Sequence, residues 1–256
     1  MGTNIIAPTF GHGRFLLGAG AVFALGAAAS GGTITSVTWG ASAGARAASA
    51  TFSNDGGSLV VSLRNTSQSD VLNPSEVLTS MFFNISGSTI SLSRDSAVVP
   101  GGSTVLFGGT DPGGVVGGEW AYNSGLHNAP GDNTYGISSS GLNFFGPHDR
   151  FPGSNLAGPE SPGGIDYGIT SAGDDPNVGN TPVTGTNPLI KNEAVFHLGG
   201  LPSGFDPLTR ITSVTFQYGT STSEPSLEGH IVPAPGALGL LTLGGLIAAR
   251  HRRRSS

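Results

Sequence analysis

The middle of the chain contains several short segments in which apolar and polar residues alternate. In 58–64, for example, Leu59, Val61 and Leu63 would share one face of an extended strand, with the intervening residues on the other face. Alternation with a period of two is typical of strands that are buried on one side. The segments that follow this pattern are 33–39, 58–64, 81–85, 89–93, 104–107, 194–198 and 211–218.

Turn-forming sequences separate these segments. Asn-Asp-Gly-Gly at 54–57 lies between residues 51–53 and the segment 58–64, and this arrangement predicts a β-hairpin. The chain has 43 Gly and 17 Pro among 256 residues. Long helices are disfavoured, because Gly costs about 1 kcal/mol and Pro about 3 kcal/mol per helical position. Residues 30–230 are therefore predicted to form an all-β domain, a β-sandwich or jelly-roll-like fold with long Gly/Pro-rich loops.

Region 108–188 differs from the rest because it is dense in Gly, Pro, Asn and Asp, with aromatic residues scattered through it. Loops of this length within a compact domain are usually functional or disordered, so we expect any binding surface to lie here. Trp120 and Tyr122 would share one face of an extended segment and could form a sugar-stacking platform. Aromatic residues at this spacing are more often part of a core, and we favour that interpretation.

Asp132, Asp174 and Asp175 lie in Gly/Pro-containing loops of the same region. Carboxylates and backbone carbonyls in such loops can converge on Ca²⁺. None of the three fits an EF-hand or a calcium-binding nonapeptide repeat. Aspartate also favours turns for its local hydrogen bonds, which is the preferred explanation here. We expect no cofactor, with calcium at these residues as the alternative.

No catalytic motif is evident. The histidines do not form an H-E-x-x-H pair, and the segment 136–141 has one residue too many for the G-x-S-x-G nucleophile elbow. Nothing in the sequence places a serine beside a histidine and an acid. The sequence therefore predicts a protein that is not an enzyme, and a hydrolase is the least favoured alternative.

The N-terminus has the composition of a secretory signal peptide. Arg14 precedes a run of about 15 uncharged, mainly apolar residues, and Ala27, Ala28 and Ala29 close it. A positive residue, an apolar stretch and an A-x-A exit are the marks of such a signal. A buried helix would not be expected to contain three glycines in this run. Residues 1–29 are thus predicted to engage the Sec translocon and signal peptidase, with cleavage near Ala29.

The C-terminal segment 231–256 has three parts in order: a Pro-x-Pro element, an apolar stretch and a basic cluster. The apolar stretch, 236–249, would measure about 21 Å as a helix, whereas the hydrocarbon core of a membrane is about 30 Å thick. The positive-inside rule would keep the arginines that follow it in the cytoplasm and place the β-domain outside. A marginal anchor of this kind suits a segment that is held briefly and then removed.

This tail resembles the PEP-CTERM sorting signal. That resemblance implies recognition by exosortase, a membrane enzyme, and cleavage near the Pro-x-Pro element. The usual middle residue is Glu, and Ala234 replaces it here, as in a common Val-Pro-Ala-Pro variant. An ordinary C-terminal anchor with a stop-transfer cluster is the alternative. The residues that carry the resemblance are Val232, Pro233, Ala234, Pro235, Arg250, Arg252, Arg253 and Arg254.

The body contains a second resemblance. Its segments 117–122, 135–142, 188–196 and 216–225 are similar to a domain of exosortase-dependent surface proteins of the XDD type. The similarity would cover about residues 33–228. It implies the same export and sorting route and no particular activity.

Charge and cysteine content restrict the partners. All 16 acidic residues lie in the body, residues 30–230, which holds only six basic residues and therefore carries a net charge of −10. Such a body repels phosphate backbones, and we expect no nucleic-acid partner. The chain has no cysteine and therefore no disulfide.

Together these features predict an exported protein of the envelope, surface or extracellular matrix of a Gram-negative-type bacterium. It would be processed by exosortase, touch the membrane through its C-terminal helix before processing, and have a structural or adhesive role associated with exopolysaccharide and biofilm. A carbohydrate-binding, lectin-like module of the envelope is the alternative.

Overall fold

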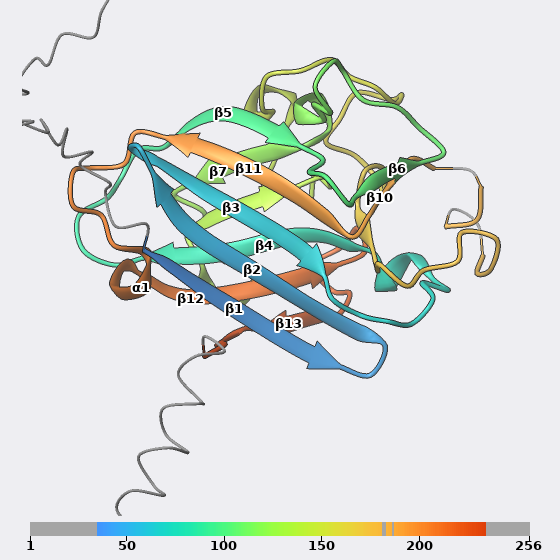
Figure 1. Ribbon diagram of the computed structural model, residues 1–256, viewed down its shortest axis with the longest axis horizontal. Helices are drawn as coiled ribbons and strands as arrows, with labels where there is room; N and C mark the ends of the chain where they lie inside the picture. The colour runs from blue at the N-terminus through green and yellow to red at the C-terminus, as the bar shows by residue number, and fades with distance from the viewer. Residues whose placement is uncertain (1–34, 181–182, 186, 234–256) are drawn as a thin grey trace, which may run out of the picture. The chain divides into compact units, whose positions relative to one another are not determined.

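The structure is a computed structural model that describes residues 35–180, 183–185 and 187–233. The predicted signal peptide 1–29, its helix and the predicted C-terminal helix lie outside these residues. The described chain folds into two β-sheets, named sheet A and sheet B here, and sheet A lies in front of sheet B in Figure 1. The prediction of an all-β protein is thus confirmed.

Sheet A has six strands in the order β14, β1, β2, β3, β11 and β5, and each neighbouring pair is antiparallel. The predicted hairpin joins β2 to β3, with Asp55 opposite Ser58. Gly56 and Gly57 have φ of 59° and 98°, the left-handed values that two-residue hairpin turns require. The strands are β1 (Ser36–Ala43), β2 (Arg46–Asp55), β3 (Ser58–Asn65), β5 (Ser93–Val98), β11 (Glu193–Gly199) and β14 (His230–Ile231).

Sheet B has eight shorter and less regular strands. Its strand β4 pairs with β12 along one edge and with β8 and β9 along the other. Only β9 and β10 pair in parallel among the described strands. The strands are β4 (Leu78–Ile85), β6 (Thr104–Leu106), β7 (Ala121–Ser124), β8 (Tyr135–Ser138), β9 (Ile169–Thr170), β10 (Leu189–Lys191), β12 (Ile211–Tyr218) and β13 (Ser226–Glu228).

The described helices are single turns that connect the strands. They are η1 (Pro74–Glu76), η2 (Gly117–Glu119), η3 (Pro130–Asp132), η4 (Pro147–Asp149) and α1 (Pro207–Arg210). Within the described residues, no helix has the length and apolar character needed to cross a membrane.

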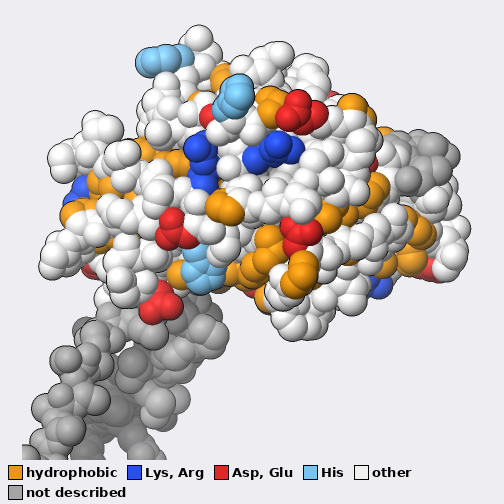
Figure 2. All heavy atoms as spheres, turned by 90° about the horizontal axis from the view of Figure 1, so that it is seen from above, with side chains coloured by type: hydrophobic (Ala, Val, Ile, Leu, Met, Phe, Trp, Pro, Cys, Tyr) orange, Lys and Arg blue, Asp and Glu red, His pale blue; other side chains and the backbone are white. Residues whose placement is uncertain are grey.

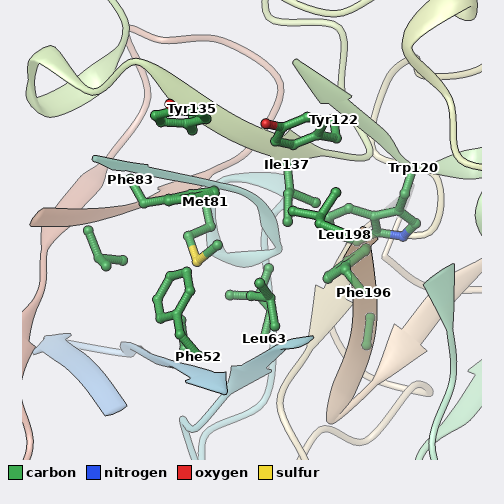
Figure 3. Packing of buried hydrophobic residues seen from close by; sticks show 14 of the residues in the cluster. Phe52, Leu63, Met81, Phe83, Trp120, Tyr122, Tyr135, Ile137, Phe196 and Leu198 are labelled. Carbon is green, nitrogen blue, oxygen red and sulfur yellow. The ribbon is translucent and has the colours of Figure 1, made fainter. Parts of the chain in front are cut away.

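The main hydrophobic core lies between the two sheets (Figure 3). Phe52 of β2 packs against Phe83 of β4, with ring centroids 5.3 Å apart. The leucines and valine at 59, 61 and 63 of β3 are fully buried, as the alternating pattern predicts. Burial of apolar surface of this kind is the main favourable contribution to folding.

The outer faces of the two sheets are covered differently. On sheet B, Phe82 packs against Leu126, Leu142 and Phe145, which belong to the connections around β8. Sheet A instead carries hydroxyl side chains on its outer face, where Thr38 and Thr51 are hydrogen-bonded through their Oγ1 atoms at 2.9 Å. The long connections therefore add a second small core to sheet B.

Most of the predicted strands are present, but the strand predicted at 89–93 begins later in the chain than expected. The segment 89–93 was expected to be a strand, but 89–92 has no strand partner and β5 begins at Ser93. Ile90 and Leu92 are nevertheless buried in the main core. The alternating pattern therefore predicted correctly which side chains are buried, but it did not predict that the segment lacks a partner strand. The short strands β7 to β10, β13 and β14 have no clear alternating pattern and were not predicted.

Candidate functional site

The structure places Trp120 and Tyr122 inside the main core. Their exposed fractions are 0% and 3%, and the Trp120 ring lies 4.9 Å from that of Phe196. Burial also raises the pKa of the Tyr122 hydroxyl, which keeps it protonated. A sugar-stacking platform needs an exposed ring face, and neither residue offers one. The favoured interpretation, that both belong to the core, agrees with the structure (Figure 3).

The three calcium candidates are separated into two places. Asp132 lies in η3, whereas Asp174 and Asp175 lie in the loop that follows β9. In the part of the chain that the structure describes, no group of three or more His, Cys, Asp or Glu side chains is arranged to hold a metal ion. The neighbouring carboxylates at 174 and 175 instead accept hydrogen bonds from the backbone.

Asp174 joins two loops. It is 3% exposed, and its Oδ1 accepts a hydrogen bond of 2.8 Å from the backbone N–H of Val71. Burial raises the pKa of this carboxyl. Exposed Asp175 behaves oppositely: hydrogen bonds from the backbone and side-chain amides of Asn177 lower its pKa. Asp174 and Asp175 therefore have the local structural roles that aspartate favours in turns.

Glu119 is a buried carboxylate that the sequence analysis did not single out. Its exposed fraction is 1%, and Oε1 accepts hydrogen bonds from the backbone N–H groups of Leu156 and Ala157. Its Oε2 accepts another from the hydroxyl of Ser161. The sequence signal that could have identified Glu119 is its position between two glycines and a tryptophan, because a carboxylate buried in such a setting needs hydrogen-bond donors. Glu119 therefore holds the loop 156–161 against η2.

The serine-rich segment 136–141 is also structural. Ser138 is fully buried, its Oγ lies 2.5 Å from that of Ser80, and the same hydroxyl donates to the carbonyl of Ser140. These bonds occupy the hydroxyl that a nucleophile would need free. The segment therefore ties β8 to β4.

The surface over the long connections carries few charges (Figure 2). Arg94 of β5 and Arg150 are each paired with an acid: Arg94 lies 3.6 Å from Asp149, and Arg150 lies 3.5 Å from Glu160. Exposed pairs of this kind contribute little to stability. We place no binding site on this surface.

The predicted sorting motif begins at the edge of sheet A. Val232 and Pro233 are described and exposed, whereas Ala234, Pro235, Arg250, Arg252, Arg253 and Arg254 lie outside the described residues. The last strand, β14, includes Ile231, so the fold extends one residue beyond the predicted domain boundary at 230. The motif thus starts immediately after the last strand of the body.

The chain reaches this edge by crossing from one sheet to the other. β13 pairs with β12 in sheet B, and β14 pairs with β1 in sheet A. Gly229 lies between them, buried, and its N–H bonds to the carbonyl of Val214. A Cβ at this glycine would lie 3.2 Å from Phe216 Cε2, so a larger residue would crowd the crossing.

We call the place where the motif leaves the fold the exit edge, formed by Thr38–Gly40 of β1, Leu208 of α1 and His230–Pro233. Trp39 lies opposite Ile231 and Gly40 opposite His230. The N–H of Val232 donates a 2.8 Å hydrogen bond to the carbonyl of Thr38. This bond extends the pairing of β14 into the first residue of the motif.

Gly40 provides the space for the Val232 side chain. A Cβ placed on Gly40 would lie 2.9 Å from Val232 Cγ2, closer than such atoms approach in proteins. Glycine in the interior of a strand often marks a close approach of another chain segment, which is the signal that could have identified it from the sequence. Gly40 therefore makes the outer face of β1 able to accept the motif.

Exposed apolar side chains gather at the exit edge. Leu208, Ile231 and Val232 are 53%, 50% and 48% exposed. A groove of about 630 Å³ is lined by Leu208, residues 36–38 and residues 231–233. Since β14 has only two residues and is exposed on both, it is the least firmly held strand end of the body.

Comparison with known proteins does not identify a family for this chain. No protein-family model, no curated protein and no solved structure matches the chain.

Proposed function

We propose that this chain is an exported, exosortase-processed protein of the bacterial surface or extracellular matrix, with a non-catalytic structural or adhesive role associated with exopolysaccharide. The body would be a β-sandwich between an N-terminal secretory signal and a C-terminal sorting segment. We prefer the sandwich to a jelly roll, because β1, β2 and β3 follow one another within sheet A instead of alternating between sheets.

The observation that carries this proposal is the position of the sorting motif. The last strand ends at Ile231, and Val232 and Pro233 lie exposed at the sheet edge. A cut in the Pro-x-Pro element would therefore leave all described strands intact. It would also release the apolar stretch 236–249 and the arginines as one piece.

The route of the chain supports export as well. β1 begins at Ser36 and pairs antiparallel with β14, so the chain enters and leaves the body at the same sheet edge. The first and last described strands thus lie side by side at this edge. This arrangement suits a body that is delivered and processed at a membrane surface.

Intact-mass analysis of surface material tests the proposal. We expect a mature chain that begins near Ser30 and ends near Pro235, and unprocessed chain when exosortase is deleted. Replacing Arg252, Arg253 and Arg254 together with alanine should reduce processing, because the basic cluster would no longer fix the tail. Full-length chain that stays in the cytoplasm would exclude the proposed function.

A carbohydrate-binding role based on Trp120 and Tyr122 receives no support, since both rings are in the core. Association with exopolysaccharide would have to use other residues. Pull-down of the purified body with exopolysaccharide from the same bacterium measures this association directly. A Trp120→Phe variant, which changes a core side chain only, is the control and should bind as the original body does.

A further inference from the structure

The exit edge holds part of the motif that the processing enzyme must reach. Proteins are cleaved in extended, locally opened chain, and a residue that is hydrogen-bonded in a sheet is not available to a second partner. Val232 is bonded to Thr38 through its N–H, and its side chain occupies the space above Gly40. The residues just before the Pro-x-Pro element are therefore engaged with the folded body.

We propose that Thr38 and Gly40 position the sorting motif: pairing of β14 with β1 holds Val232 on the body, and the processing enzyme acts only after β14 separates from β1. This inference rests on the proposed function and concerns how the same motif is presented. Thr38 and Gly40 are positioning residues, and they take no part in the chemistry.

The pairing is suited to reversible opening. β14 bridges β1 at two residue pairs, and a single further bond joins Val232 to Thr38. His230, Ile231, Val232 and Pro233 are all exposed, so little buried apolar surface opposes separation. Gly229, in contrast, is buried and bonded to Val214, which sets a limit to the opened segment. Opening would therefore free residues 230–233 and leave β13 in place.

The rate of processing should follow the population of the opened form when opening and closing are faster than cleavage. Filling the space above Gly40 should raise this population, because the Val232 side chain would have to shift and the paired form would be crowded. A covalent bond across the pair should abolish it. These two changes act in opposite directions on one step, which makes the inference sharply testable.

The first variant is Gly40→Val. In membrane vesicles that contain exosortase and the full-length chain, we expect processing to accelerate on the order of tenfold, as overpacking of this size predicts. The matched control is Gly109→Val: no heavy atom lies within 4 Å of a Cβ at Gly109, and its φ is not in the left-handed region. The control should be processed at the rate of the original chain.

The second variant combines Thr38→Cys with Val232→Cys. Directly opposed residues in antiparallel strands have the Cα separation that a disulfide needs, and the chain has no other cysteine to interfere. We expect the oxidised form to be processed at least tenfold more slowly than the reduced form of the same protein. This comparison corrects for the altered motif residue and does not depend on the fold of Gly40→Val.

The outcomes separate the inference from the proposed function. If the original chain is processed and neither Gly40→Val nor the disulfide changes the rate, the positioning role is wrong and the sorting proposal stands. If the original chain is never processed by exosortase, the proposed function itself fails. Faster processing of Gly40→Val together with a redox-dependent block supports the positioning role.

Discussion

Sheet A and the region 108–188 reach a folded state by different means. In sheet A, β1, β2 and β3 follow one another as hairpins in continuous register, and their apolar side chains alternate toward the core. In 108–188 the described strands are two to four residues long, and the backbone N–H groups of Leu156 and Ala157 bond to the buried carboxylate of Glu119. Sheet A is therefore ordered by its alternating side chains, whereas the region 108–188 depends on specific polar contacts.

This difference shows what a Gly- and Pro-rich sequence needs in order to be ordered. Backbone N–H groups that do not enter a sheet still require acceptors when they are buried. Glu119 supplies acceptors for the loop 156–161, and Asp174 supplies one for Val71. Trp120, Tyr122 and Tyr167 of the region are buried, so the long connections contribute to the core.

Removing a large apolar side chain from sheet A should have the largest effect. We expect Phe52→Ala to lower the free energy of unfolding by about 3–5 kcal/mol, because a fully buried ring that contacts Phe83 leaves a cavity. Chemical denaturation followed by fluorescence measures this value. The control is Thr51→Ala on the outer face of the same strand, which should cost less than about 1 kcal/mol. Equal effects at both positions would contradict the assignment of the faces.

Removing a polar contact from the long connections should come next. We expect Glu119→Ala to cost about 3 kcal/mol, since two partly buried N–H groups would lose their acceptor at about 1–3 kcal/mol each. Glu119→Gln should cost less because it keeps one acceptor oxygen. Hydrogen exchange should show the loss of protection concentrated at residues 156–161.

The control for Glu119 is Glu160→Ala, which removes a carboxylate that is 64% exposed and paired with Arg150. It should change the free energy of unfolding by less than about 1 kcal/mol. If Glu119→Ala proves as mild as this control, then polar contacts do not organise the region.

The smallest effect concerns pH. Burial raises the pKa of Asp174 above its unfolded value, so its contribution to stability is complete below the unfolded pKa and is lost as pH rises through the folded pKa. Asp174→Asn should therefore gain thermal stability relative to the original chain as pH increases from about 3 to 6, provided that its amide oxygen still accepts from Val71.

Asp175→Asn is the matched control because its carboxyl has a lowered pKa. Its contribution is present above the unfolded pKa and is lost as pH falls, so this variant should lose stability relative to the original chain as pH increases. Melting temperatures measured across the same buffers should diverge in opposite directions. Parallel changes would show that the two carboxyls share one environment.

Much of the fold could be predicted where the alternating pattern is long. The segment 211–218 coincides with β12, and 58–64 lies within β3. The two-residue strands β9 and β14 could not be predicted, since a period of two cannot be recognised in two residues. Of the site residues, Val232 and Pro233 were identified from the motif, whereas Gly40 and Leu208 were not, because their role depends on which segment lies beside them.

The sequence by itself determined that this is an all-β body, with a central hairpin whose apolar residues face inward, because strand periodicity and glycine turns act locally. It also contains the apolar and basic patterns at both ends on which export and sorting are proposed. Only the tertiary structure decided that Trp120 and Tyr122 are core residues, that Glu119 holds a distant loop, and that Val232 rests on Gly40. These outcomes depend on contacts between residues far apart in the chain, which no local pattern specifies.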